Sequence, residues 1–131
     1  MSNNIPQVLI VDDDKFLLNM YSIKFTKSGF EVSAVTSGQE ALNKIKGGYN
    51  PDVVLLDVVM PVMDGFEILA TIRKENLVPT ASVIMLTNQG QLSDIEKAKS
   101  YNVAGYIIKA TTIPSEVVEE VTRIYNLNKK S

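Results

Sequence analysis

Short apolar runs alternate with amphipathic segments along most of this 131-residue chain. The apolar runs are rich in β-branched residues and are bounded by polar or turn residues, a pattern that predicts β-strands. In the segments between them, apolar residues recur three or four positions apart, which predicts helices. The chain is therefore expected to form five consecutive strand–helix units. The predicted strands cover residues 8–11, 32–35, 53–56, 83–86 and 106–108.

The predicted helices carry recognisable end signals. A helix over residues 15–28 is expected to stop at Gly29, because glycine readily adopts the left-handed conformation that ends helices. Ser37, with Glu40 three residues later, resembles a capping box that opens the second helix. Pro114 lies in the expected first turn of the last helix, where its fixed φ angle is tolerated.

Strands separated by helical crossovers pair in parallel, with right-handed connections and helices on both faces of the sheet. The unbroken apolar run at residues 53–56 supports this arrangement, because a strand covered on both faces does not alternate with polar residues. The sequence therefore predicts a three-layer α/β fold, a flavodoxin-like doubly wound sheet with strand order 2-1-3-4-5. Ligands of such sheets bind beyond the carboxyl ends of the strands where the order reverses, here between the first and third strands.

Charged residues follow three of the predicted strands. Asp12 and Asp13 come directly after the first strand, with Asp14 behind them. Asp57 follows the third strand and Lys109 the fifth. Because the carboxyl ends of parallel strands meet at one edge, these side chains are expected to gather in one crevice. Neighbouring carboxylates repel by on the order of 4 kcal/mol per pair at an effective dielectric of about 20, so the crevice favours a bound cation.

The composition restricts which cation and which reaction fit this crevice. The chain has no cysteine and no histidine, which excludes thiolate catalysis, Ser-His-Asp chemistry and zinc sites built from those residues. A hard cation held by oxygen, Mg²⁺ above all, fits the remaining ligands. With Mg²⁺ bound, Asp57 is the candidate nucleophile for a phosphoryl group and Lys109 its cationic partner. Thr87, at the end of the fourth strand, offers a hydroxyl donor.

The charge and the N-terminus exclude other kinds of partner. A formal net charge of −2 gives no long-range attraction for nucleic acid or anionic membranes. No apolar run approaches the roughly 18 residues of a membrane span, and no basic region followed by an apolar stretch begins the chain. We therefore expect a cytoplasmic protein without direct nucleic-acid or membrane binding.

Four separated segments resemble the signature segments of response-regulator receiver domains of two-component signalling, in particular the chemotaxis regulators. The resemblance covers about residues 7–126 and keeps the order and spacing of that family. It implies a receiver domain over residues 1–126 and a short tail over residues 127–131 with no effector domain after it, either as a stand-alone protein or as a receiver cut from a longer one. The segments are residues 9–14 (LIVDDD), 55–65 (LLDVVMPVMDG), 85–87 (MLT) and 105–109 (GYIIK).

The resemblance implies roles for the residues of the crevice. Asp57 would accept a phosphoryl group from the phosphohistidine of a sensor kinase or histidine phosphotransfer protein. Asp13 and Asp57 would bind Mg²⁺ directly with the backbone carbonyl of Val59, and Asp12 would act mainly through metal-bound water. Such a domain is a signalling switch that catalyses only its own phosphorylation and dephosphorylation.

The family also implies how the signal is transmitted. Lys109 would contact the phosphoryl oxygens, and Thr87 would be drawn toward them while the ring of Tyr106 turns inward. Phosphorylation adds roughly 1.5 to 2 negative charges and thereby favours one arrangement of the neighbouring loop and helices. The face that changes is formed by the fourth helix, the fifth strand and the fifth helix, and it would bind a downstream protein or a second copy of the chain.

Four positions near the crevice distinguish this chain. The residue after the strand-five lysine is usually a cis-linked proline in the family, whereas here it is Ala110, for which a cis bond costs about 2.5 to 4 kcal/mol. Asn88 is larger than the small residue usual at its position and is expected to affect donor access. Val59 and Gln89 stand where family members tune hydrolysis. Apolar Val59 is expected to slow dephosphorylation, with Gln89 partly compensating.

Simpler interpretations stay open for the single residues. Asp13 or Asp14 is suited to cap the following helix, and Asp57 or Lys109 to end a strand. A receiver-like module that works through protein contacts without phosphorylation also stays open, since Asn88 and Ala110 leave room for it. FMN-binding flavodoxins, Gly-rich dehydrogenases and aspartyl phosphohydrolases fit less well. The remaining structural interpretations are Thr87 as a strand-end residue, Tyr106 as an edge-packing residue, and Asp64 with Gly65 as the turn before the third helix.

Overall fold

The computed structural model, which describes residues 5–88 and 92–128, contains one five-stranded parallel sheet. Its strand order is β2-β1-β3-β4-β5, so the predicted flavodoxin-like topology is confirmed. All adjacent pairs run in parallel, and the order reverses between β1 and β3, as a doubly wound sheet requires. The strands are β1 Gln7–Val11, β2 Glu31–Val35, β3 Val53–Asp57, β4 Ser82–Thr87 and β5 Gly105–Ile108.

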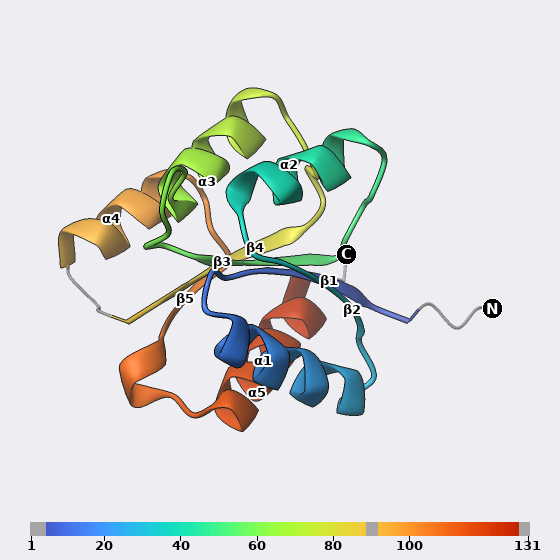
Figure 1. Ribbon diagram of the computed structural model, residues 1–131. Coiled ribbons are helices and arrows are strands. Elements are labelled where there is room, and N and C mark those ends of the chain that lie inside the picture. Colours follow the sequence, from blue (N-terminus) through green and yellow to red (C-terminus); the bar gives the residue numbers. More distant parts are fainter. Residues whose placement is uncertain (1–4, 89–91, 129–131) are drawn as a thin grey trace.

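Helices cover both faces of the sheet (Figure 1). Helices α1 and α5 lie on one face, and α2, α3 and α4 lie on the other. None of the helices in the described part of the chain combines the length and apolar character that a membrane span requires. The helices are α1 Lys15–Lys27, α2 Gly38–Lys46, α3 Gly65–Lys74, α4 Leu92–Ser100 and α5 Pro114–Asn128, with a short 3₁₀-helix η1 at Lys109–Thr111.

The sheet separates two apolar cores, because successive strand residues point to opposite faces. In β3, Val54 and Leu56 pack against the α2 and α3 side, whereas Val53 and Leu55 pack against the α1 and α5 side. All five residues of β3 and all six of β4 are buried. Burial on both faces explains why these strands read as unbroken apolar runs.

Side chains cap the helices at the positions where the chain leaves the sheet. Ser37 accepts a hydrogen bond from the Glu40 backbone, but the Glu40 carboxylate accepts from the Thr36 backbone N–H. The predicted capping box of α2 is therefore formed only in part. The complete box belongs to α3, where Asp64 and Glu67 each accept a hydrogen bond from the other's backbone N–H. Asp64 thus caps the start of α3, which agrees with its predicted place at the beginning of that helix.

Candidate functional site

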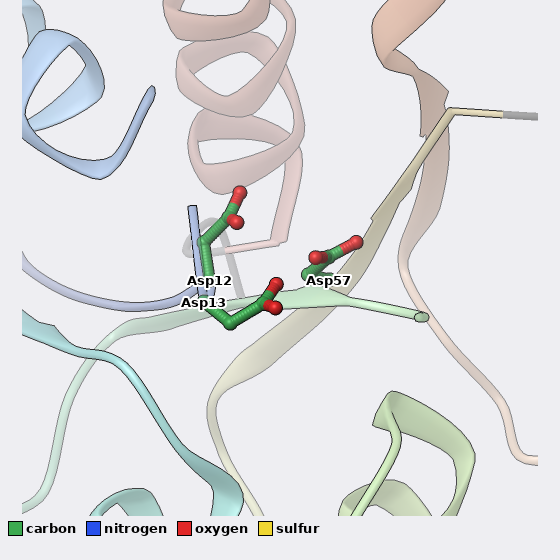
Figure 2. Close-up of side chains that lie close together, drawn as sticks. All are labelled: Asp12, Asp13 and Asp57. Atoms are coloured by element: carbon green, nitrogen blue, oxygen red, sulfur yellow. The ribbon is translucent and has the colours of Figure 1, made fainter. Parts of the chain in front are cut away.

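Three carboxylates meet at the carboxyl edge of the sheet. Asp12 and Asp13 follow β1, Asp57 ends the neighbouring strand β3, and Figure 2 shows the three side chains gathered at these strand ends. One carboxylate oxygen from each lies within 4.8 Å of the others. Asp12 is fully buried and Asp57 is 5% exposed, whereas Asp13 is exposed. The carboxylate cluster therefore has one side open to solvent, through which a ligand can enter.

Lys109 is the cation of this site. Its side chain, 6% exposed, comes from the first residue of η1. The Lys109 Nζ donates to Asp12 Oδ2 at 2.7 Å and lies 3.5 Å from Asp57 Oδ1. One ammonium is thus shared by two buried carboxylates, with Asp12 the closer partner. Because a third carboxylate, Asp13, lies in the same cluster, the site keeps an excess of negative charge.

Burial and neighbouring charge change the acidity of Asp57. Burial of the side chain is the main cause that raises the Asp57 pKa from 3.8 to about 7, against the lowering effect of Lys109. The charges of Asp12 and Asp13 raise this pKa further. In the metal-free protein the ionised form of Asp57 is therefore disfavoured. A divalent cation counteracts both causes by adding positive charge next to the carboxylate.

The three consecutive aspartates have different structural roles. The Asp14 carboxylate caps α1 by accepting a hydrogen bond from the Leu17 backbone N–H at 3.1 Å. The Asp12 Oδ1 atom accepts from the Asp14 backbone N–H at 2.9 Å, which fixes the orientation of the Asp12 carboxylate. Capping is thus the role of Asp14, and the Asp12 and Asp13 carboxylates point toward the Asp57 cluster.

The chain that follows β3 returns close to Asp57. The Gly65 backbone N–H donates to the Val58 carbonyl at 2.9 Å, so α3 begins directly beside the end of β3. A Cβ atom at position 65 would lie 2.4 Å from the Asp57 carbonyl oxygen. Only glycine allows this approach. Val59, in the loop between these points, is 73% exposed, which leaves its side chain at the solvent-facing side of the site.

Thr87 and Tyr106 lie on the neighbouring strands. Thr87 is 3% exposed at the end of β4, and it pairs in register with Ile108 of β5. Tyr106 packs against the core on the α2, α3 and α4 side. Its hydroxyl oxygen is buried and makes no hydrogen bond within the described residues, and burial followed by the charge of Asp94 raises its pKa.

The sequence singles out three further positions near the site, Asn88, Gln89 and Ala110. Asn88 follows β4 and is exposed. Gln89 lies outside the described residues. No cis peptide bond occurs among the described residues, so the Lys109–Ala110 bond is trans, and Ala110 continues into the 3₁₀ turn. The path of the loop after Lys109, which the sequence left open, is therefore a 3₁₀ turn.

Tyr21 belongs to the surroundings of the site although the sequence did not single it out. It lies on α1 and is only 2% exposed. Burial raises its pKa to about 12, and the charges of Asp12, Asp57 and Asp14 add to the effect. In the sequence, Tyr21 fits the apolar repeat of a helix, which predicts a core residue. No sequence signal separates a core tyrosine from one whose hydroxyl approaches the site.

The residues of the cluster match the ligand preference of a hard divalent cation. Asp12, Asp13 and Asp57 offer only oxygen ligands, and their mutual repulsion is relieved by added positive charge. Mg²⁺ keeps several water ligands and commonly binds one or two carboxylates together with a phosphate oxygen. The exposed position of Asp13 leaves room for such water and phosphate ligands.

Comparison with known proteins agrees with this geometry. Residues 8–122 match the family model of the response regulator receiver domain. The chain is 35% identical over 119 residues to the chemotaxis protein CheY of Thermotoga maritima, which covers 90% of this chain and 96% of that protein. It is also 34% identical over 109 residues to the probable transcriptional regulator ycf27 of Pyropia yezoensis, covering 83% of this chain.

The chain spans only 43% of the length of that transcriptional regulator. Among solved structures, a CheY-like receiver domain protein of Methanospirillum hungatei superposes with a TM-score of 0.86 at 26% identity, covering 97% of this chain and 98% of that one. The matched residues include both strand ends that carry the carboxylates and the strand that precedes Lys109. On these grounds the chain belongs to the response regulator receiver domain family of two-component signalling.

Proposed function

We propose that this chain is a phosphorylation-dependent signalling switch that accepts a phosphoryl group on Asp57. The observation that carries the proposal is the buried cluster in which Lys109 contacts both Asp12 and Asp57 while Asp13 stays open to solvent. The donor would be the phosphohistidine of a sensor histidine kinase or of a histidine phosphotransfer protein.

The residues of the site would have different roles in the phosphoryl transfer. Asp12, Asp13 and Asp57, with the Val59 backbone carbonyl, would hold Mg²⁺, which offsets the charge of the phosphoryl oxygens. An Asp57 oxygen forms the bond to phosphorus as the bond from phosphorus to the donor nitrogen breaks. Lys109, already 3.5 Å from Asp57, is placed to neutralise the oxygens of the transferred group.

The phosphoryl group then changes the contacts around it. Once Lys109 turns toward phosphoryl oxygens, its 2.7 Å contact with Asp12 weakens. Thr87, buried at the end of β4, supplies a hydroxyl donor, and its movement changes the space behind it into which the Tyr106 ring packs. The result is a changed face over α4, β5 and α5 for a downstream partner or a second copy of the chain. The charge change is about 1.5 to 2 units, enough for several charge-assisted contacts.

Intact-mass analysis tests the proposal directly. The wild type, incubated with Mg²⁺ and acetyl phosphate, is expected to gain one phosphate adduct, whereas Asp57→Asn gains none. Omission of Mg²⁺ is expected to suppress the adduct in the wild type. A wild type that stays unmodified, or an adduct retained in Asp57→Asn, would contradict the proposal and favour a module that works through protein contacts alone.

Val59, Gln89 and Asn88 are proposed to set the lifetime of the phosphorylated state. The exposed, apolar Val59 side chain offers no hydrogen bond to an attacking water molecule. Val59→Asn is therefore expected to lose phosphate faster than the wild type, measured as decay of the adduct after the donor is removed. Slower loss from Val59→Asn would show that Val59 does not limit hydrolysis.

A further inference from the structure

A cavity of about 400 Å³ lies at the amino edge of the sheet, opposite the edge that carries Asp57. It is formed by the start of β4, the loops that precede β4 and β5, the end of α3 and the last turn of α5. Cavities of this size hold small organic molecules. Because none of its lining residues belongs to the carboxylate cluster, this cavity is separate from the acceptor site.

Arg73 supplies the single charge among the described residues that line the cavity. Its Nε and Nη2 atoms donate to the Tyr101 and Asn102 carbonyls at 2.7 Å and 3.0 Å, which fixes the plane of the guanidinium. A guanidinium has five N–H donors, so these two contacts leave donors over. Arg73 forms no ion pair with a carboxylate in the described part of the chain. A fixed guanidinium without a carboxylate partner is suited to bind a carboxylate or phosphate group.

Two hydroxyl groups line the same cavity. Ser82 is 6% exposed, and its Oγ atom accepts a hydrogen bond from Asn128 Nδ2 at 2.9 Å. That contact joins the last turn of α5 to the first residue of β4. It uses Ser82 as an acceptor, so the hydroxyl hydrogen remains available as a donor. The exposed Thr80 side chain adds a second hydroxyl.

The rest of the lining defines what fits. Pro79, Val83 and Ala104 form a short apolar wall. No aspartate or glutamate lines the cavity among the described residues, so an anion that enters meets no like charge in the wall. No aromatic side chain of the described residues lines it either, so a nucleotide base would find no stacking surface. One cation, two hydroxyls and a short apolar wall suit a single oxyanion on a short carbon skeleton.

We propose that this cavity binds a small organic anion, whose carboxylate or phosphate group accepts hydrogen bonds from Arg73 and from the Thr80 and Ser82 hydroxyls. The apolar wall contacts the carbon skeleton of the anion. A bound anion joins the end of α3 to the loop before β4 and to the first residue of β4. The inference goes beyond the proposed function and does not depend on it, because the cavity lies at the other edge of the sheet.

Titrations of the metal-free wild type, followed by amide NMR shifts at constant ionic strength, test the site. Glycerol 3-phosphate and lactate carry the two kinds of oxyanion on short skeletons, and glycerol is the uncharged control. At least one anion is expected to shift the amide signals of Ser82, Asn102 and Ala104 in a saturable way, and the tighter one identifies the preferred oxyanion. Glycerol is expected to shift none of them. Shifts confined to Asp12 and Asp57 would place the anion at the acceptor site and overturn the inference.

Three variants then identify the groups that hold the anion. Arg73→Met is expected to raise its dissociation constant by more than tenfold, the value of hydrogen bonds to a charged group. Thr80→Val leaves the Arg73 contacts with the chain after α4 in place and removes one hydroxyl, so a rise of about fivefold is expected. Lys74→Met removes an exposed cation next to Arg73 in the sequence and is expected to bind as the wild type does. Equal weakening in Lys74→Met and Arg73→Met, unchanged binding in both Arg73→Met and Thr80→Val, or no saturable shift with either anion would overturn the inference.

Discussion

Strand β3 and helix α4 are anchored to the molecule in opposite ways. All five residues of β3 are buried, whereas Ala98 is the only buried residue of Leu92–Ser100. Asp57, the proposed phosphoryl acceptor, therefore lies on an element that moves only if the core opens. Helix α4 buries little apolar surface, so it can shift at small cost. The two elements therefore differ in how much buried apolar surface opposes their movement.

Helix α4 is held mainly near its C-terminal end. Arg73 of α3 donates from Nε to the Tyr101 carbonyl at 2.7 Å and from Nη2 to the Asn102 carbonyl at 3.0 Å, just after α4. The Lys97 ammonium lies over the Phe66 ring, 4.6 Å from its centroid. The two Arg73 hydrogen bonds hold the chain just after the C-terminal end of α4, and the Lys97 contact holds its second half against the start of α3. The N-terminal part of α4 is less firmly packed, with Leu92 70% exposed.

The largest expected effect concerns the anchored region. Lys109→Met removes the ammonium from two buried carboxylates at 2.7 Å and 3.5 Å while keeping the length of the side chain. Leaving a buried charge unpaired is expected to lower the free energy of unfolding by about 3 to 5 kcal/mol in the absence of metal. Urea unfolding with a chelator measures the loss, and added Mg²⁺ should recover part of it.

Lys99→Met is the control for that loss. Lys99 is exposed on α4, so its replacement is expected to change the free energy of unfolding by no more than about 0.5 kcal/mol. If Lys109→Met and Lys99→Met cost the same, the contrast between the anchored site and the loosely held helix would be wrong.

The second prediction uses the raised pKa of Asp57. The folded-state pKa of about 7 lies above the ordinary value of 3.8, so the ionised carboxylate destabilises the metal-free fold above about pH 7. This penalty disappears as the pH falls toward 3.8, where the unfolded chain also takes up the proton. Asp57→Asn, which removes the charge, should therefore stabilise the metal-free protein by about 4 kcal/mol at about pH 8, and by less than about 1 kcal/mol at about pH 4.

Thermal or urea unfolding across this pH range, always with a chelator present, measures the difference. Glu96→Gln on exposed α4 removes one negative charge outside the site and is expected to show no such dependence on pH. A stabilisation by Asp57→Asn that is constant with pH would mean that relief of ionised Asp57 is not its cause.

The sequence predicted the anchored region better than the responsive one. Unbroken apolar runs such as residues 53–56 are long enough to identify buried strands, and parallel pairing then places Asp12 and Asp57 at one edge. Helix α4 carries a weak apolar repeat because Ala98 is its only buried residue. The repeat therefore did not predict which contacts attach α4 to the rest of the domain. Its attachment through Arg73 joins a side chain to backbone carbonyls 28 and 29 residues away, which no local pattern encodes.

The sequence predicted which residues form the site, but it did not predict which of their side chains contact one another. The sequence placed Lys109 beside the acceptor, yet its shortest contact is with Asp12, a pairing 97 residues apart that depends on the 3₁₀ turn after β5. Two of the three consecutive aspartates, Asp13 and Asp14, were capping candidates, and only the backbone geometry selects Asp14. The sequence did not identify Tyr21 as a site residue. An apolar repeat predicts that its ring is buried but does not predict where its hydroxyl lies.

The third prediction tests the attachment of α4. Arg73→Met keeps the aliphatic part of the side chain and removes both hydrogen bonds to the chain after α4. Loss of two bonds from a charged donor is expected to lower the local opening free energy of α4 by about 1.5 kcal/mol. Hydrogen exchange should therefore speed up by about tenfold in α4 and stay unchanged in β3. Lys74→Met, the exposed neighbour, is the control, and equal acceleration in β3 would refute a local clamp.

The smallest expected effect lies in the loop that joins the anchored strand to α3. Val62 has a φ of 69° and is fully exposed, so a β-branched residue occupies the left-handed region without any burial to compensate. Asparagine adopts this conformation more easily, and Val62→Asn is expected to stabilise the protein by about 1 kcal/mol with an unchanged urea m-value. Val62→Thr keeps the branched Cβ while adding polarity, so it separates strain from exposed apolar surface. A gain in Val62→Thr as large as in Val62→Asn would mean that surface polarity, and not backbone strain beside the acceptor, limits this loop.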